Sequence, residues 1–201
     1  RQPLSLFLIG TTGTGKTEIG KALAQALYDS PDRAAVIPLG GVKTEVELGQ
    51  VFGSGVGYSG HTEIRAFEQA LIDNPEGGVI ILDEASNMGG NDRQLKEALF
   101  KKFYNILDEG RWTSTATNKT YDLSKYTLLF TGNDGDAVFR GISSDDLRIT
   151  TWKKLNTRDM VRTILRENGV PEPLIARIAD LIIFKPNIKS ERIQIYKKLI
   201  D

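Results

Sequence analysis

The segment at residues 10–17, which reads GTTGTGKT, constrains this chain more than any other feature. It fits the pattern G-x-x-x-x-G-K-[ST] at every fixed position, after an apolar run at 4–9 and before a stretch with helical apolar spacing at 17–28. Glycines let backbone N–H groups wrap closely round phosphates, and a helix N-terminus favours an anion. We therefore predict a phosphate-binding loop between a buried strand and a helix.

Two side chains in this loop have distinct expected tasks. Lys16 would reach the β- and γ-phosphates, and the Thr17 hydroxyl would coordinate Mg²⁺, so ATP and Mg²⁺ are the expected cofactors. The alternative is a glycine-rich turn that matches by chance, which the strand–loop–helix context disfavours. The loop residues assigned to nucleotide binding are Gly10, Thr11, Thr12, Gly13, Thr14, Gly15, Lys16 and Thr17.

Two adjacent carboxylates follow a second apolar run. Residues 79–82 are apolar throughout, as in a central parallel strand, and Asp83 and Glu84 come next. One such carboxylate can meet the Mg²⁺ shell while the other polarises a water, so we assign Asp83 to the metal and Glu84 to the general base. Asp108 and Glu109 form a rival pair, but they follow a helix-like stretch and are interpreted as a polar helix end.

Strand-like and helix-like stretches alternate along most of the chain. Further strands are expected at 34–39, 127–130 and 181–184, helices at 45–52, 62–74, 93–107, 158–168, 173–179 and 190–200, and a hairpin at 111–122. Four glycines within 53–60 indicate a loop. The alternation predicts an α/β fold whose mainly parallel five-stranded sheet has helices on both faces.

Composition narrows the classes of function. The 201 residues carry 26 basic and 26 acidic side chains, a net charge of zero that disfavours a nucleic-acid-tracking role. The absence of cysteine excludes disulfides and thiolate catalysis. No apolar run approaches the roughly 18 residues of a membrane span. The chain opens on Arg1 just before a strand, so we expect a cytoplasmic fragment of a longer protein, with no signal peptide.

With these motifs in order, the sequence resembles the second ATPase module of the ClpA/ClpB class of AAA+ protein unfoldases. The resemblance covers nearly the whole chain and implies that residues 1–201 are the large nucleotide-binding subdomain. It also adds Glu18 to the nucleotide site. The segments that carry it are the phosphate loop at 6–18, a Gly-aromatic-x-Gly pore loop within 51–60, an Asp-x-Gly-Arg hairpin at 108–113, a sensor strand at 128–133 and an arginine-finger segment at 171–184.

The resemblance implies two further catalytic residues beside Glu84. Asn133 would be the sensor that positions the attacking water, and Arg177 would be the finger that enters the neighbouring subunit's ATP site. The plainer interpretations are an asparagine that satisfies a turn and an arginine on a surface helix. Arg140 is a rival finger, but its Phe-Arg-Gly setting lacks the family's following helix and strand.

The resemblance also implies a substrate pore loop. Tyr58 would face a central channel and grip an extended polypeptide through its apolar area, unless it packs down to close its own loop. Asn118 and Lys119 are candidates for a second, polar pore contact. The residues assigned to the pore loop are Gly57, Tyr58, Ser59 and Gly60.

Several positions depart from the family pattern. Residues 85–90 lack the usual Glu-Lys pair, Gly55 and Val56 stand where two prolines are usual, and residues 140–142 do not fit a protease-docking loop. His61 is interpreted as a solvent-side loop residue. The helical lid and the segment before the first strand are expected to lie outside this chain.

The leading hypothesis is an ATP-driven remodeller that assembles as a homo-oligomeric ring, expected to be a hexamer, and threads protein through its pore. One alternative is a nucleotide-regulated scaffold that translocates nothing. Another is a specialised motor that dismantles one assembly, such as a secretion-system sheath. Expected partners are copies of the chain and a polypeptide substrate, with neither membrane nor nucleic acid.

Overall fold

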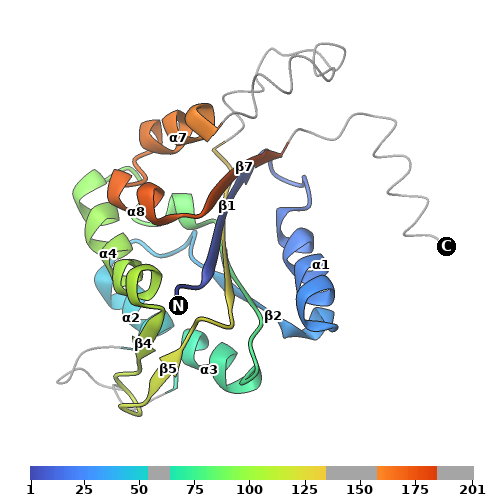
Figure 1. The fold of residues 1–201 in the computed structure, drawn as a ribbon. Coiled ribbons are helices and arrows are strands. Elements are labelled where there is room, and N and C mark those ends of the chain that lie inside the picture. Colours follow the sequence, from blue (N-terminus) through green and yellow to red (C-terminus); the bar gives the residue numbers. More distant parts are fainter. Residues whose placement is uncertain (54–63, 135–157, 185–201) are drawn as a thin grey trace.

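Five strands form one parallel sheet in the order β2-β3-β6-β1-β7 (Figure 1). The computed structural model describes residues 1–53, 64–134 and 158–184. The predicted five-stranded parallel sheet is therefore confirmed. Its strands are β1 (Leu4–Gly10), β2 (Ala34–Pro38), β3 (Val79–Asp83), β6 (Thr127–Gly132) and β7 (Asp180–Phe184).

Helices cover both faces of the sheet, but unequally (Figure 1). Only α1 packs on one face, and the other described α-helices contribute side chains to the larger core on the opposite face. Among the described residues no helix is long and apolar enough to cross a membrane. The helices are α1 (Lys16–Tyr28), α2 (Glu45–Phe52), α3 (Ala66–Asp73), α4 (Arg93–Glu109), α7 (Arg158–Glu167) and α8 (Glu172–Arg177).

The pleat of β1 divides its side chains between two hydrophobic clusters. Phe7 and Ile9 point into the larger cluster, whereas Leu8 points toward α1. The Phe7 ring stacks on Phe130 of β6 with centroids 5.7 Å apart, and Phe103 of α4 meets Phe130 edge-on at 5.3 Å. This aromatic column joins the two central strands to α4.

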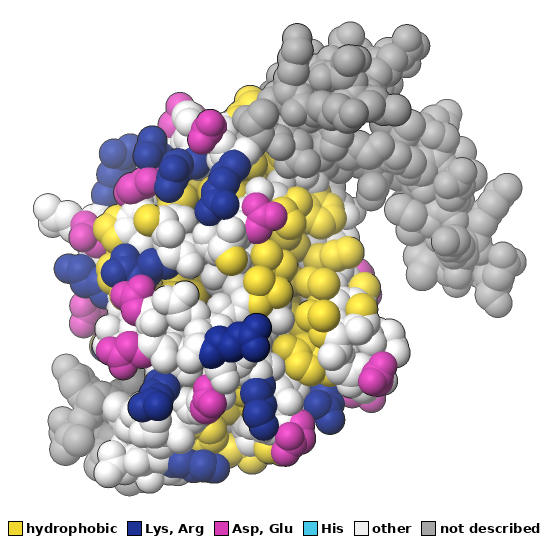
Figure 2. Space-filling view, in the orientation of Figure 1, with side chains coloured by type: hydrophobic (Ala, Val, Ile, Leu, Met, Phe, Trp, Pro, Cys, Tyr) yellow, Lys and Arg dark blue, Asp and Glu magenta, His cyan; other side chains and the backbone are white. Residues whose placement is uncertain are grey.

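Because α1 is the only described helix on its face, that face keeps apolar surface exposed. Leu27 of α1 and Val36 of β2 remain exposed, and Leu4 at the start of β1 is 46% exposed although it was predicted to be buried. Figure 2 shows hydrophobic side chains gathered over this side, beside the charged side chains of the helical layer.

The remaining elements follow the sequence pattern with local differences. The predicted hairpin is β4 (Arg111–Thr113) paired antiparallel with β5 (Thr120–Asp122). Two 3-10 turns, η1 (Pro31–Arg33) and η2 (Ala85–Asn87), were not predicted. Of the helix predicted at 62–74, α3 begins only at Ala66, and the apolar side chains of Ile64 and Ile72 are 47% and 40% exposed. The expected helix at 190–200 lies outside the described residues.

Helix α1 approaches the sheet closely because Gly20 carries no side chain. A Cβ at Gly20 would lie 2.3 Å from Cδ1 of Ile81 and 3.2 Å from Cδ2 of Leu129, both fully buried. We predict that Gly20→Val destabilises the fold by about 1–3 kcal/mol through overpacking, as measured by urea denaturation. Ala22→Val on the exposed side of the same helix is the matched control, with an expected cost of roughly 0.5 kcal/mol. Equal losses in the two variants would contradict close packing at Gly20.

Candidate active site

The three predicted catalytic segments meet at one edge of the sheet because β6 lies between β1 and β3. Leu4 and Val79 both align with Thr127, and all three strands run in the same direction. Their carboxyl ends therefore open at a common edge. The phosphate loop follows β1, Asp83 is the last residue of β3 with Glu84 directly after it, and Asn133 follows β6.

The phosphate loop adopts the geometry that its glycines permit. Gly13 has φ of 77°, and Gly15, the residue before α1, has φ of 85°, both in the left-handed region that favours glycine. A Cβ at Gly10 would lie 2.8 Å from the carbonyl oxygen of Phe184, so the loop leaves β1 pressed against β7. Substitution at these positions would distort the loop.

Lys16 lies over the loop that it belongs to. Its Nζ donates to the carbonyl oxygens of Gly10 at 2.9 Å and Thr11 at 2.8 Å, and the residue is 7% exposed. Thr14 supports the same turn by donating from Oγ1 to the carbonyl of Thr11. The ammonium is thus held at the loop rather than packed into the apolar core, where a phosphate-binding lysine would have no use.

Thr131 links the two acidic residues, and sequence reasoning missed it. Its hydroxyl donates to Asp83 Oδ1 at 2.7 Å and accepts from the backbone N–H of Glu84 at 2.9 Å. Thr17 Oγ1 lies 3.3 Å from the same Asp83 oxygen. The available signal was a hydroxyl side chain at the end of an otherwise apolar strand, two residues before Asn133.

Glu84 is held in an unusual conformation between two neighbours. Its φ of 54° is left-handed, which a non-glycine residue adopts only when its surroundings impose it. Asn133 Nδ2 donates to Glu84 Oε1 at 2.9 Å. A Cβ at Gly40 would lie 2.3 Å from Glu84 Oε2, so the glycine after β2 makes room for the carboxylate. The predicted base and the predicted sensor are therefore direct neighbours.

Thr17 and Asp83 suit a magnesium ion in a nucleotide site. No group of three or more His, Cys, Asp or Glu side chains within the described parts of the chain could hold a metal by itself. Mg²⁺ bound with a nucleotide needs only one or two protein oxygens, because phosphates and waters complete its octahedral shell. The adjacent oxygens of Thr17 and Asp83 fit that requirement.

Arg177 lies at the opposite end of β1 from the phosphate loop. The Arg177 carbonyl accepts from Ser5 Oγ, whereas Gly10 pairs with Phe184 at the other end. The four residue steps from Leu6 to Gly10 span roughly 13 Å of strand. The structure therefore does not bring Arg177 to the loop of its own chain.

The Arg177 guanidinium has its own set of partners. Its Nε lies 2.9 Å from both carboxylate oxygens of Asp108, and its Cζ lies 4.6 Å from the ring centroid of Tyr104. Asp108 and Glu109 are the last residues of α4, which confirms their interpretation as a helix end rather than a second catalytic pair.

The other predicted residues have different positions. Glu18 lies in the first turn of α1 and pairs with Lys21 at 2.9 Å, with both side chains largely exposed. Asn118 has φ of 55° at the hairpin tip, and Lys119 Nζ lies 4.7 Å from the ring centroid of Tyr121. The predicted pore loop, Gly57 to Gly60, lies outside the described residues, as do His61 and Arg140.

Sequence comparison places the chain in a family of ATPases. Residues 6–147 match the family described as "ATPase family associated with various cellular activities (AAA)". The chaperone protein ClpB of Clostridium perfringens is 31% identical over 208 residues, and ClpB 2 of Synechocystis sp. is 30% identical over 191 residues. These alignments cover 100% and 95% of the chain but only 21% and 20% of the relatives, so the chain spans about a fifth of their length.

Solved structures show the same fold. The S. cerevisiae Hsp104–ADP complex matches with a TM-score of 0.75 at 24% identity, over 99% of this chain and 32% of that one. A closed-state structure of Hsp104 with ATPγS and FITC casein matches with a TM-score of 0.75 at 23% identity, over 100% of this chain and 32% of that one. The chain belongs to the AAA family of ATPases, as a module similar to those of the ClpB chaperones.

Proposed function

We propose that residues 1–201 are the large nucleotide-binding subdomain of a ring-forming protein unfoldase that couples ATP hydrolysis to the threading of polypeptide. The observation that carries the proposal is the convergence of the phosphate loop, Asp83, Glu84 and Asn133 at one edge of the sheet. The resemblance of the 108–113 hairpin and the 171–184 segment favours the second ATPase module of the ClpA/ClpB class.

Each residue at this edge has a separate task in the proposed reaction. The loop amides and Lys16 bind the phosphates. Thr17 and Asp83 would hold Mg²⁺, which would supply positive charge to the β- and γ-phosphates. Glu84 accepts the proton of the attacking water, and Asn133 fixes the direction of both the water and the carboxylate. Thr131 keeps Asp83 and Glu84 in register, so that the carboxylate that would hold the metal and the carboxylate that activates the water face the same phosphate.

The proposed oligomer follows from the position of Arg177. A finger that cannot reach its own chain's loop serves the loop of a neighbour, and repetition of that head-to-tail contact closes a ring. We infer a hexamer for this ring. The ion pair with Asp108 and the contact with Tyr104 would hold the guanidinium at the subunit boundary until the neighbour docks.

The proposed substrate is an extended polypeptide. The support is the similarity to ClpB proteins and to a structure of Hsp104 that contains casein, together with the aromatic residue Tyr58 between glycines. The hairpin tip at Asn118 and Lys119 is a second candidate contact. The zero net charge agrees with a protein substrate rather than nucleic acid, and the proposed compartment is the cytoplasm.

Glu84→Gln is predicted to preserve nucleotide binding and to abolish turnover. The amide keeps the size and one acceptor of the side chain but cannot take a proton from water, so kcat should fall by about 10²–10⁴-fold. Release of phosphate measures turnover, and a fluorescent nucleotide measures binding. Glu109→Gln is the matched control at the rival acidic pair, and wild-type turnover in Glu84→Gln would remove the assignment of the base.

Arg177→Ala should also abolish turnover, by up to about 10³–10⁵-fold, and mixing should reveal where the arginine acts. A mixed ring places an Arg177→Ala subunit with intact Glu84 beside a Glu84→Gln subunit with intact Arg177. Such an interface has both catalytic groups, so two inactive variants should regain activity when they are assembled together. A mixture as inactive as its components would show that Arg177 does not serve a neighbour.

Tyr58→Ala should lower the amount of protein unfolded per ATP hydrolysed, because the side chain would lose the apolar area that grips the polypeptide. The measurement is the rate at which a stably folded fluorescent protein loses its fluorescence, divided by the rate of phosphate release. Tyr58→Phe is the control that keeps the ring. If wild-type hydrolysis drives no unfolding at all, the nucleotide-regulated scaffold becomes the better account of the chain.

Thr131→Val tests the link between the acids. Valine fills the same space but removes the hydroxyl, so kcat should fall by about tenfold to a hundredfold, as when the support of a metal ligand is lost, with nucleotide affinity nearly unchanged. Thr127→Val is the matched control, because Thr127 is also buried but lies at the other end of β6, near Tyr28. A similar fall in kcat for both variants would contradict a specific role for Thr131.

A further inference from the structure

A buried lysine beside the active site has no explanation in the helix that carries it. Lys96 lies in the first turn of α4, just after the cap that Asp92 forms by accepting from the N–H groups of Gln94 and Leu95. A cation is unfavourable there because the helix N-terminus is itself positive. Lys96 is also only 4% exposed, and burial of an ammonium costs free energy unless it is well paired. Both facts mean that contacts outside α4 must offset the cost of placing the ammonium there.

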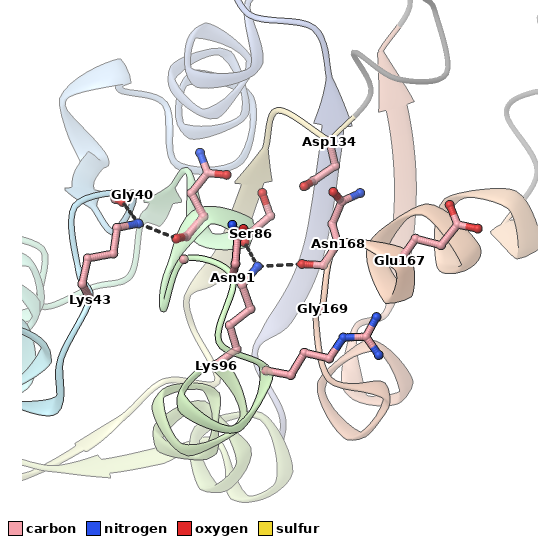
Figure 3. Close-up of a pocket in the computed structure, with 12 residues that line it drawn as sticks. Gly40, Lys43, Ser86, Asn91, Lys96, Asp134, Glu167, Asn168 and Gly169 are labelled. Atoms are coloured by element: carbon pink, nitrogen blue, oxygen red, sulfur yellow. Dashed lines mark hydrogen bonds between the residues drawn. The ribbon is translucent and has the colours of Figure 1, made fainter.

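The ammonium group of Lys96 joins two chain segments that are far apart in sequence. Nζ donates to the carbonyl of Ser86 at 2.5 Å and to the carbonyl of Asn168 at 2.6 Å. Ser86 lies in η2, two residues after Glu84, and Asn168 directly follows α7. Figure 3 shows both bonds, with Lys96 rising between the two segments.

A third segment lines the same cavity as Lys96. Asp134 follows Asn133 and points toward Ser86 and Asn168 in Figure 3. Burial lowers the pKa of Lys96, and the nearby Asp134 carboxylate opposes that shift. Burial likewise raises the pKa of Asp134, against the neighbouring Ser86 hydroxyl and Lys96. The lysine thus bonds the backbone that follows the base, and its charge lies near the carboxylate that follows the sensor.

Two glycines let the surrounding chain close on the lysine stem. Gly89 has φ of 77°, and a Cβ there would lie 2.8 Å from Cγ of Lys96. Gly169 has φ of 79°, and its Cβ would lie 3.4 Å from Cδ. The cluster lines a polar cavity of about 570 Å³ whose other walls include Gly40, the glycine against Glu84.

The segment that accepts from Lys96 at Asn168 continues to the proposed arginine finger, Arg177. After Asn168 and Gly169 the chain passes directly into α8, whose last residue is Arg177. Arg162 and Arg166 of α7 both pair with Glu172 of α8, so the two helices are tied together. A displacement of the α7 end would therefore be passed to α8.

We propose that Lys96 is a positioning residue that connects the catalytic edge to the α7–α8 unit. Through the Ser86 carbonyl it fixes the backbone next to Glu84, and through the Asn168 carbonyl it passes the nucleotide-dependent arrangement of that backbone to the helix pair that ends at Arg177. Occupancy of one ATP site thereby affects the finger that the same chain offers to its neighbour. This inference rests on the catalytic roles proposed above for Glu84 and Asn133.

The test compares Lys96→Met, Asp134→Asn and the double variant in the full chain. Lys96→Met alone leaves a buried carboxylate without its cation, so it should lower thermal stability as well as activity. The double variant removes both charges and should regain most of the stability. Its kcat should nevertheless stay about tenfold or more below that of the wild type, with KM nearly unchanged, because the backbone carbonyls have lost their common donor. Lys102→Met, exposed on the same helix, is the matched control.

Hydrogen exchange supplies a measurement that does not depend on hydrolysis. In the wild type, a non-hydrolysable ATP analogue with Mg²⁺ should slow amide exchange both in the phosphate loop and at residues 164–170. In the double variant the loop should still be protected, and the protection at 164–170 should be lost. Retained protection at 164–170 in that variant, no protection there in the wild type, or recovery of kcat together with stability would each overturn the proposal.

Glu84→Gln in the same assays separates two kinds of failure. Unchanged hydrolysis in Glu84→Gln would reject the proposed base, whatever the Lys96 variants do. Nucleotide-dependent protection of residues 164–170 that persists in the double variant, which lacks Lys96, would instead reject the coupling role alone.

Discussion

The parallel pairing of β6 with both β1 and β3 is the constraint on which the candidate site depends. It aligns three strand ends, so that a phosphate loop, two acids and an asparagine from distant parts of the sequence open at one edge. The Thr131 hydroxyl then sets the finer geometry, because it bonds the Asp83 side chain and the Glu84 backbone at once. A shift of β6 by one residue would turn this hydroxyl to the other face of the sheet and separate the acids.

Sequence patterns predicted those parts of the fold and of the candidate site that follow a regular apolar spacing or carry a motif. The phosphate loop was predictable because its full pattern lies between a strand and a helix, and Asp83 and Glu84 because two adjacent carboxylates follow a buried apolar run. The five strands were predictable from their apolar runs. The exposure of Leu4, Ile64 and Ile72 could not be predicted. The spacing of apolar residues shows which side chains share a face, but not whether another element covers that face. The roles of Thr131 and Lys96 could not be predicted, because their partners are distant in the sequence and only the fold brings them close.

Lys96 also has a contact in the stretch at 85–90, which lacks the charged pair expected from the resemblance to the ClpA/ClpB class. The backbone there folds into η2 and turns at Gly89 and Gly90. The carbonyl of Ser86 in that turn is what Lys96 binds. The buried ammonium of Lys96 in α4 therefore makes a contact beside the candidate site that the side chains of residues 85–90 do not make. The stretch at 85–90 stays joined to the rest of the fold without charged side chains of its own.

In the proposed ring, the position of Arg177 makes each chain contribute to two different ATP sites. Its own loop and acids lie at the carboxyl ends of the strands, whereas Arg177, tied to Asp108, lies beyond the amino end of β1. If the arginine serves a neighbour, the contact joins two unlike surfaces, and only a closed ring satisfies every site. For ATP to be hydrolysed in successive subunits of such a ring, the ATP site of a chain and the Arg177 of the same chain must influence each other. The sheet lies between the ATP site and Arg177, but the pairing of its strands fixes their relative positions. It is therefore a poor route for transmitting a change from one to the other. The path through Lys96 and α7 goes round the sheet, over a helix pair that two arginine–glutamate ion pairs hold together.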